Sequence, residues 1–116
     1  CYDLRFPELY RRLATAGAEL FSIPSAFTVP TGRAHWHTLL RARAIENLAW
    51  VIAPAQVGEH TSGRQTFGHS LIIDPWGGIV AECAGGPGVI FAHLDRDKAA
   101  QRRQQFPALT HRVLDR

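Results

Sequence analysis

Cys1 is the residue of this sequence with the clearest potential for chemistry. It stands just before a short turn that leads into a helix expected to begin near Pro7. That position exposes a side chain at the end of a sheet, where α/β enzymes place catalytic groups. A thiolate is a strong nucleophile once a neighbour takes its proton, and the N–H of Tyr2 is a candidate donor to an oxyanion. On this pattern alone, a structural cysteine is the commoner interpretation.

Two histidines, His35 and His37, raise the question of a metal site. They are two residues apart on an expected helix, so their side chains point in different directions and cannot share one ion. No cysteine or carboxylate completes a ligand set at the usual spacing. We therefore predict that the protein has no metal and no other cofactor.

Four charged residues are interpreted as part of the scaffold. Arg43 and Glu46 are three residues apart on a helix that we expect to be buried, so they can pair. A buried charge without a partner costs several kcal/mol. We predict that Arg5, Glu8, Arg43 and Glu46 form ion pairs that hold this helix behind the turn at Cys1, and that they take no direct part in catalysis.

The first half of the chain alternates helices with strands. After Pro7, apolar residues recur with helical spacing as far as Gly17, which is a candidate C-cap. The next predicted elements are a short strand at 19–24, a loop at 25–32 and a largely buried helix at 33–49 with Thr31 as its N-cap.

The second half is richer in short apolar segments. The sequence Pro75-Trp76-Gly77-Gly78 is typical of a hairpin turn. Strands are predicted at 50–56, 70–74, 79–83 and 88–94, a polar loop at 57–67, a polar helix at 95–105, and an exposed tail after it. Helices alternating with strands, followed by a hairpin, favour an α/β fold with a mixed sheet.

Composition excludes several classes of protein. The formal net charge of +3 comes from arginines scattered along the chain, which indicates a solvated surface and no nucleic-acid partner. No apolar run approaches the roughly 20 residues that span a bilayer, so no membrane association is expected. Two cysteines do not make a disulfide framework, which favours a reducing, cytoplasmic location.

Three segments resemble successive motifs of the nitrilase (carbon–nitrogen hydrolase) superfamily. They are CYDLRFPELYRRLA at 1–14, AELFSIPSAFTVPTGRAHWHTLLRARAIENLAWVIAPAQVG at 18–58 and GHSLIIDPWGGIVAE at 68–82. The similarity is to the Nit-type amidases and runs from residue 1 to about residue 113. The parts SAFTVPTGRAHW and RARAIENLAWVIAPAQ look most like the branch of the deaminated-glutathione amidases and ω-amidases.

This resemblance implies an αββα sandwich in which Cys1 is the nucleophile. In the family, the cysteine attacks a nitrile or amide carbon and forms a thioester, a glutamate is the base and acid, and a lysine with a backbone N–H stabilises the oxyanion. The expected substrate is the amide of a small linear carboxylic acid. The glutamate and lysine precede the cysteine in the family, so neither falls within residues 1–116.

The chain starts at cysteine and has no methionine, so we expect a fragment. Residues 1–116 would then be one partial domain without its N-terminal half, inactive by itself. The whole protein is expected to be a homodimer or a larger assembly.

The resemblance also implies binding roles and two departures from the family pattern. The N–H of Tyr2 would face the oxyanion, and Ser25, Ala26 and Phe27 match a loop that forms one wall of the substrate pocket, although a plain turn after a strand is an alternative. His37 stands where related amidases usually have glutamate, and Phe67 where tyrosine is common. Both changes affect the expected choice of substrate.

Two other interpretations remain open from the sequence. A cysteine at position 1 also suits an N-terminal nucleophile hydrolase, whose own α-amine is the base. A protein that kept the fold and lost the chemistry would be a scaffold. The residues that precede Cys1 in the gene distinguish all three.

Overall fold

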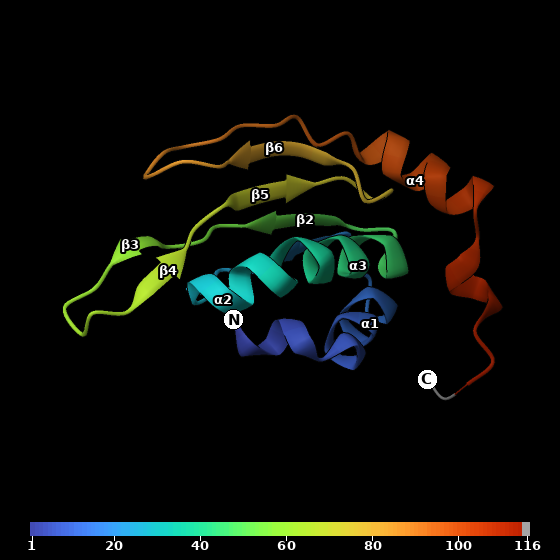
Figure 1. The fold of residues 1–116 in the computed structure, drawn as a ribbon. Coiled ribbons are helices and arrows are strands. Elements are labelled where there is room, and N and C mark those ends of the chain that lie inside the picture. The colour runs from blue at the N-terminus through green and yellow to red at the C-terminus, as the bar shows by residue number, and fades with distance from the viewer. Residues whose placement is uncertain (115–116) are drawn as a thin grey trace.

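The computed structural model describes residues 1–114, in which helices pack against one face of a mixed sheet (Figure 1). The sheet has the order β1-β2-β5-β6, with β1 at Leu20–Ser22, β2 at Trp50–Ala53, β5 at Ser70–Ile73 and β6 at Ile79–Cys83. β1 and β2 are parallel, whereas β5 is antiparallel to both of its neighbours. The predicted α/β class with a mixed sheet is confirmed.

Helical elements occur before, between and after the strands of this sheet. A 3-10 turn, η1 (Tyr2–Arg5), precedes α1 (Pro7–Thr15). One long helical stretch consists of α2 (Val29–Thr31), a π-helical turn η2 (Gly32–Trp36) and α3 (His37–Asn47). The chain then ends with α4 (Arg96–Gln105) and a second 3-10 turn, η3 (Ala108–His111).

The main core lies between the sheet and the helices α1 and α3. Val51 from β2, and Leu71 and Ile73 from β5, point to this side and are fully buried, as are Trp36 and Leu40 from the helical stretch. Side chains alternate between the faces of a strand, so these residues define one face. The opposite face carries a smaller cluster of Trp50, Ile72 and Ala99.

The end of α1 was predicted correctly from local signals. Gly17 has a φ of 108°, a left-handed conformation that glycine adopts without strain. Its N–H bonds to the carbonyl of Ala14 at 3.0 Å, and the N–H of Ala18 bonds to that of Leu13 at 3.0 Å. These two bonds form a Schellman motif, which turns the chain from α1 toward β1.

The start of the second helix was predicted wrongly. The helical stretch begins at Val29, after Thr28, four residues before the predicted start, so Thr31 lies inside it and is not its N-cap. Gly32 indicated a loop, yet it lies inside the helical stretch, where the ring of Phe67 leaves no room for a side chain. A Cβ at position 32 would lie 2.2 Å from Cγ of Phe67.

The predicted loop at 57–67 is instead a hairpin of β3 (Val57–Glu59) and β4 (Gln65–Phe67). A turn that contains Gly63, with a φ of 82°, reverses the chain between the two strands. The strands are short and polar, so their sequence lacks the apolar alternation that would have indicated them.

The predicted strand at 88–94 does not pair with any strand among residues 1–114. Its side chains nevertheless alternate, since Ile90, Ala92 and Leu94 pack on the smaller cluster while Val89 and Phe91 are exposed. The segment therefore has the side-chain pattern of a strand without the backbone pairing. We call residues 88–94 the strap, because they lie across the second face of the sheet.

One side chain of the C-terminal helix contacts three backbone carbonyls. Arg103 donates hydrogen bonds to the carbonyls of Leu48 at 3.0 Å, Asn47 at 3.1 Å and Ala18 at 3.3 Å. Beyond it, Val113 and Leu114 are exposed as predicted for the tail, and residues 115–116 lie outside the described part. Within residues 1–114, none of the helices is long and apolar enough to cross a membrane.

Candidate active site

Cys1 is exposed and immediately precedes the η1 turn. Its carbonyl accepts a hydrogen bond from the N–H of Leu4 at 3.2 Å, which closes the turn. Pro7 then begins α1, where the missing N–H of proline costs nothing. The thiol is thus presented by a short turn that is fixed at both ends.

An open hollow of about 530 Å³ lies beside Cys1. Its walls include Ser25 and Ala26, which the sequence had singled out. They follow β1, and Ala55 and Gln56 follow β2, so the hollow lies at the carboxyl ends of the two parallel strands. This is the edge at which α/β sheets bind ligands.

We call this space the thiol hollow. At its wall, the hydroxyl of Ser25 is buried without a hydrogen-bond partner in the described chain. Ser25 is only 9% exposed, and its Oγ has no hydrogen-bond partner among the described residues. Its backbone is fixed, because its N–H bonds to Pro54 O at 3.0 Å and its carbonyl accepts from Gln56 N–H at 2.9 Å. A buried hydroxyl without a partner is costly unless a ligand completes it.

Tyr2 and Phe27 lie outside the lining of the thiol hollow. The side chain of Tyr2 is 70% exposed and packs edge-on against Phe6, so only its backbone is near the thiol. Phe27 is buried in the main core against Trp36, with ring centroids 4.9 Å apart. Phe27 supports the wall from behind.

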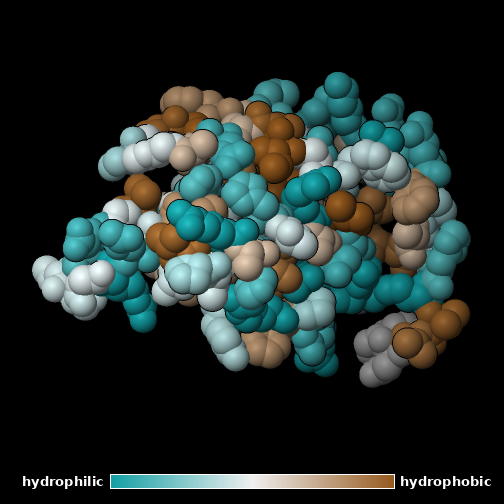
Figure 2. Space-filling view, in the orientation of Figure 1, coloured by the Kyte–Doolittle hydropathy of each residue, from teal (hydrophilic) through white to brown (hydrophobic). Residues whose placement is uncertain are grey.

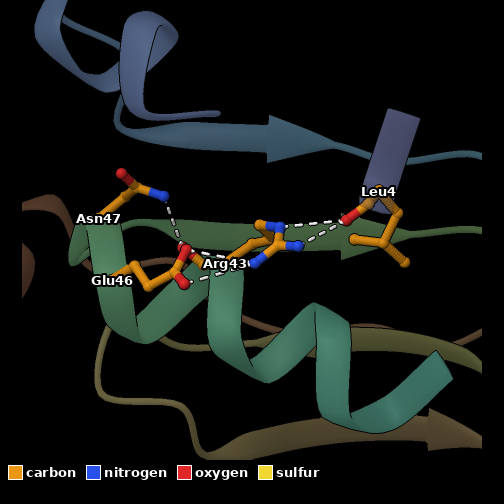
Figure 3. A network of polar contacts seen from close by, with 4 residues as sticks. All are labelled: Leu4, Arg43, Glu46 and Asn47. Atoms are coloured by element: carbon orange, nitrogen blue, oxygen red, sulfur yellow. Dashed lines mark hydrogen bonds and ion pairs between the residues drawn. The ribbon is translucent and has the colours of Figure 1, made fainter. Parts of the chain in front are cut away.

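Arg43 connects the η1 turn to α3 (Figure 3). Its guanidinium donates two hydrogen bonds to Leu4 O, at 2.8 and 3.1 Å, and lies 3.3 Å from Glu46 Oε2. Asn47 donates to the carbonyl of Arg43 at 2.9 Å. Arg43 is 4% exposed, so the bonds are shielded from water and fix the turn three residues after the thiol.

Tyr10 lies beneath the same guanidinium, which is 5.9 Å from its ring centre. Burial raises the pKa of Tyr10, and the Asp3 carboxylate raises it further, while Arg43 acts in the opposite direction. The phenol therefore remains neutral and serves as packing.

Arg5 and Glu8 have different surroundings from those predicted. Arg5 Nη1 lies 3.2 Å from His35 Nδ1, and its guanidinium lies 5.4 Å from the ring centre of Phe27. Glu8 is exposed on the first turn of α1. The structure thus gathers Arg43 and Glu46 behind the turn and places Arg5 on the histidine of η2.

The two departures from the family pattern lie side by side. His37 Nε2 is 2.8 Å from Glu82 Oε2, and its ring meets Phe67 edge-on at 6.0 Å. Since His35 contacts Arg5 and His37 contacts Glu82, the two histidines point to different elements. Among residues 1–114, no three His, Cys, Asp or Glu side chains gather in a way that could hold a metal ion.

Sequence reasoning missed Gln56 and Ser70, which also line the thiol hollow. Gln56 could have been found, because it follows a strand parallel to the one before Ser25. Ser70 begins an antiparallel strand, and its Oγ accepts from Ala55 N–H at 2.8 Å. Only the fold brings it to this edge.

These features define an α/β protein with a candidate cysteine nucleophile at the carboxyl edge of its sheet. The chain belongs to the carbon–nitrogen hydrolase family, whose profile matches residues 1–104. It is 55% identical over 113 residues to a deaminated glutathione amidase from Synechocystis, covering 97% of this chain and 42% of that protein. The predicted family and its deaminated-glutathione amidase branch are confirmed.

Two solved structures carry the same fold. The NitFhit protein of C. elegans superimposes with a TM-score of 0.94 at 51% identity, over 97% of this chain and 27% of that one. A mutant of the amidase from Nesterenkonia sp. AN1, whose structure shows the result of Michael addition of acrylamide at the active-site cysteine, gives a TM-score of 0.72 at 30% identity, over 92% of this chain and 41% of that one. The chain therefore spans less than half the length of these relatives and matches a portion of the nitrilase fold.

Proposed function

We propose that the protein hydrolyses the amide of a small linear carboxylic acid through a thioester on Cys1. The observation that carries this proposal is the thiol hollow, where an exposed cysteine borders a buried hydroxyl that lacks a partner. Membership of the carbon–nitrogen hydrolase family and similarity to deaminated glutathione amidases support an amide as the substrate.

We propose that residues 1–116 are one partial domain of a longer protein. Its relatives are more than twice as long, and the second face of its sheet is only partly covered. By resemblance to the family, the missing part holds the glutamate that acts as base and the lysine that binds the oxyanion. This chemistry needs no cofactor.

The proposed reaction has two steps. The base takes the thiol proton of Cys1, the sulfur attacks the amide carbon, and the negative oxygen is held by the lysine and the N–H of Tyr2. The base then gives its proton to the departing amine, which leaves a thioester. Water attacks this thioester, and the acid and the free thiol are released.

Two residues have supporting parts in this scheme. Ser25 Oγ offers the bound substrate the hydrogen bond that it lacks within the described chain. Arg43 acts on Leu4 O and so sets the position of the turn without touching the substrate. The cysteine that captured acrylamide in the Nesterenkonia amidase supports a reactive thiol in this part of the fold.

Replacing Cys1 in the full-length protein is the direct test. Cys1→Ala should abolish turnover of short linear amides and leave the melting temperature unchanged, and Cys1→Ser should be nearly as inactive, because a hydroxyl is a poorer nucleophile without a matched base. The matched control is Cys83→Ala, which should retain turnover and cost less than about 1 kcal/mol of stability, because Cys83 is only partly buried.

The isolated chain distinguishes the alternatives in the same assay. It should be at least ~10³-fold less active than the full-length protein, since it lacks the base and the lysine. Turnover by the isolated chain would identify an N-terminal nucleophile hydrolase. A folded full-length protein without activity on any amide would indicate a scaffold.

We also propose that the full-length protein is a homodimer or a larger assembly. Phe6, Leu9 and Leu13 lie on α1 or just before it and are 42%, 38% and 42% exposed. An apolar stripe of this kind on a surface helix is typical of an interface.

A further inference from the structure

A second hollow, of about 360 Å³, adjoins the thiol hollow. Both are lined by Ala55, Gln56 and Ser70, so these three residues form a common floor. The second hollow continues from this floor to His60 and His69 and is bounded on its far side by the turn after β6. Figure 2 shows the molecule hollowed between this turn and the β3–β4 hairpin.

The ring of His69 is held in one orientation. Phe67 stacks on it with ring centres 3.9 Å apart and planes inclined by 17°, and His37 meets it edge-on at 5.6 Å. Its Nδ1 lies 2.8 Å from Phe67 O, and since a carbonyl only accepts, Nδ1 carries the proton. His69 also has a φ of 62°, an uncommon conformation for a residue with a side chain and one that often marks a functional site.

His60 is arranged in the same way from the other side. Its Nε2 lies 2.9 Å from Thr66 Oγ1, and that hydroxyl is 3.4 Å from Gly58 O, to which it can donate. When the hydroxyl donates to Gly58 O, it accepts from His60, and Nε2 of His60 then carries the proton. Thr66 is only 5% exposed, which keeps this pair away from water.

In this arrangement each ring has its N–H committed to the protein and a second nitrogen left as an acceptor. These acceptors are Nδ1 of His60 and Nε2 of His69, and neither makes a hydrogen bond among the described residues. No acidic side chain and no lysine or arginine lines either hollow. Two acceptors without a formal charge beside them suit a hydrogen-bond donor such as a hydroxyl or an amide N–H.

We infer that the second hollow is a subsite for the far end of the substrate, and that His60 and His69 select an end that donates hydrogen bonds. This inference rests on the proposed amidase function. With the scissile carbon at Cys1, the substrate lies along Ala55, Gln56 and Ser70 and reaches the two rings. His60 and His69 are thus specificity residues, with Phe67 as the group that positions His69.

The test compares ω-hydroxyalkanamides of four to six carbons with their methyl ethers in the full-length protein. The ethers have the same chain but no donor. One hydrogen bond of ordinary strength makes the hydroxy compound roughly two- to tenfold better in kcat/KM. The difference should lie in KM, because the far end does not react, and propionamide should be indifferent to changes in this hollow.

Two variants remove one acceptor each and keep the contact to the protein. His69→Asn retains an N–H for Phe67 O, tolerates the left-handed backbone and loses the atom at Nε2. His60→Gln retains an N–H for Thr66 and loses the atom at Nδ1. Each variant should weaken the preference, and the double variant should abolish it. His93→Asn, an exposed histidine away from both hollows, is the matched control and should keep the preference.

Calorimetry on the Cys1→Ala protein gives the same comparison without turnover. Equal affinity for alcohol and ether, or a preference that survives in the double variant, would overturn the inference and leave the amidase proposal standing. A preference for an ω-carboxylate that the double variant abolishes would overturn the assignment of a donor. Loss of turnover on every amide, with the binding preference intact, would instead overturn the amidase proposal.

Discussion

The two faces of the four-stranded sheet are covered very differently. On one face, α1 and α3 enclose a continuous core. Its fully buried residues include Trp36, Leu40, Val51 and Ile73. On the other, the strap packs on a cluster of only three buried residues, one of which, Ala99, belongs to α4. That cluster includes Trp50, whose indole N–H is buried without a partner among the described residues.

The two faces differ in how completely the described residues cover them. The helix-covered face has a continuous apolar core and holds the turn at Cys1 through Arg43. The strap face has side chains in place, yet its backbone pairs with no other strand within residues 1–114. Unpaired backbone and an orphaned donor are expected where another layer packs.

Two adjacent isoleucines on β5 test the difference in cover between the two faces with the largest expected effect. Ile73 points to the helices and Ile72 to the strap. In the full-length protein, Ile73→Ala and Ile72→Ala should each lower the free energy of unfolding by about 3–4 kcal/mol, because a second layer would prevent either site from collapsing. Denaturant unfolding measures both. A cost of only about 1 kcal/mol at Ile72 would mean that the strap face has no further cover.

Trp50→Phe tests the same face with a smaller effect. If a missing layer accepts the indole hydrogen bond, the change should destabilise the full-length protein by about 1–2 kcal/mol. Trp76→Phe is the control, since Trp76 is 49% exposed and its main contact is the Arg102 guanidinium 4.2 Å from its ring centre. A neutral or stabilising Trp50→Phe would show that the N–H stays unpaired in the whole protein.

Tyr10→Phe gives the smallest effect and concerns the helix-covered face. The pKa of Tyr10 is raised above 10.0 by burial, so the folded state holds the phenol proton more tightly than the unfolded state. This contribution is complete below pH 10 and is lost as the pH rises through the higher folded pKa. Urea unfolding between pH 9 and 11 should therefore show a steeper loss of stability for the wild type than for Tyr10→Phe.

Local signals in the sequence predicted local structure well. Pro7 and Gly17 mark the ends of the region that contains α1, and Asp95 caps α4 by accepting from Lys98 N–H at 3.1 Å. The start of the second helix was missed because the need for a glycine at position 32 comes from Phe67, far along the chain. The hairpin of β3 and β4 was missed because its strands carry no apolar pattern.

The candidate site depended even more on distant contacts. The position of Cys1 before a turn favoured a structural role by itself. Only the resemblance of residues 1–14 to the nucleophile motif of the family identified it as a candidate nucleophile. The second nitrogen of His69 becomes an available acceptor only because Phe67 and the left-handed backbone at Gly68 and His69 hold the ring. No spacing in the sequence predicts such an arrangement, because it depends on the pairing of β2 with β5.

The three carbonyl contacts of Arg103 limit how far the C-terminus can be shortened without losing contacts to α3. A helix leaves its last carbonyls unbonded, and here a side chain more than fifty residues away caps the end of α3 together with the loop before β1. The family profile ends at residue 104, immediately after this arginine. Engineered termini, tags or permuted joins therefore belong after position 104, where they leave the cap of α3 in place.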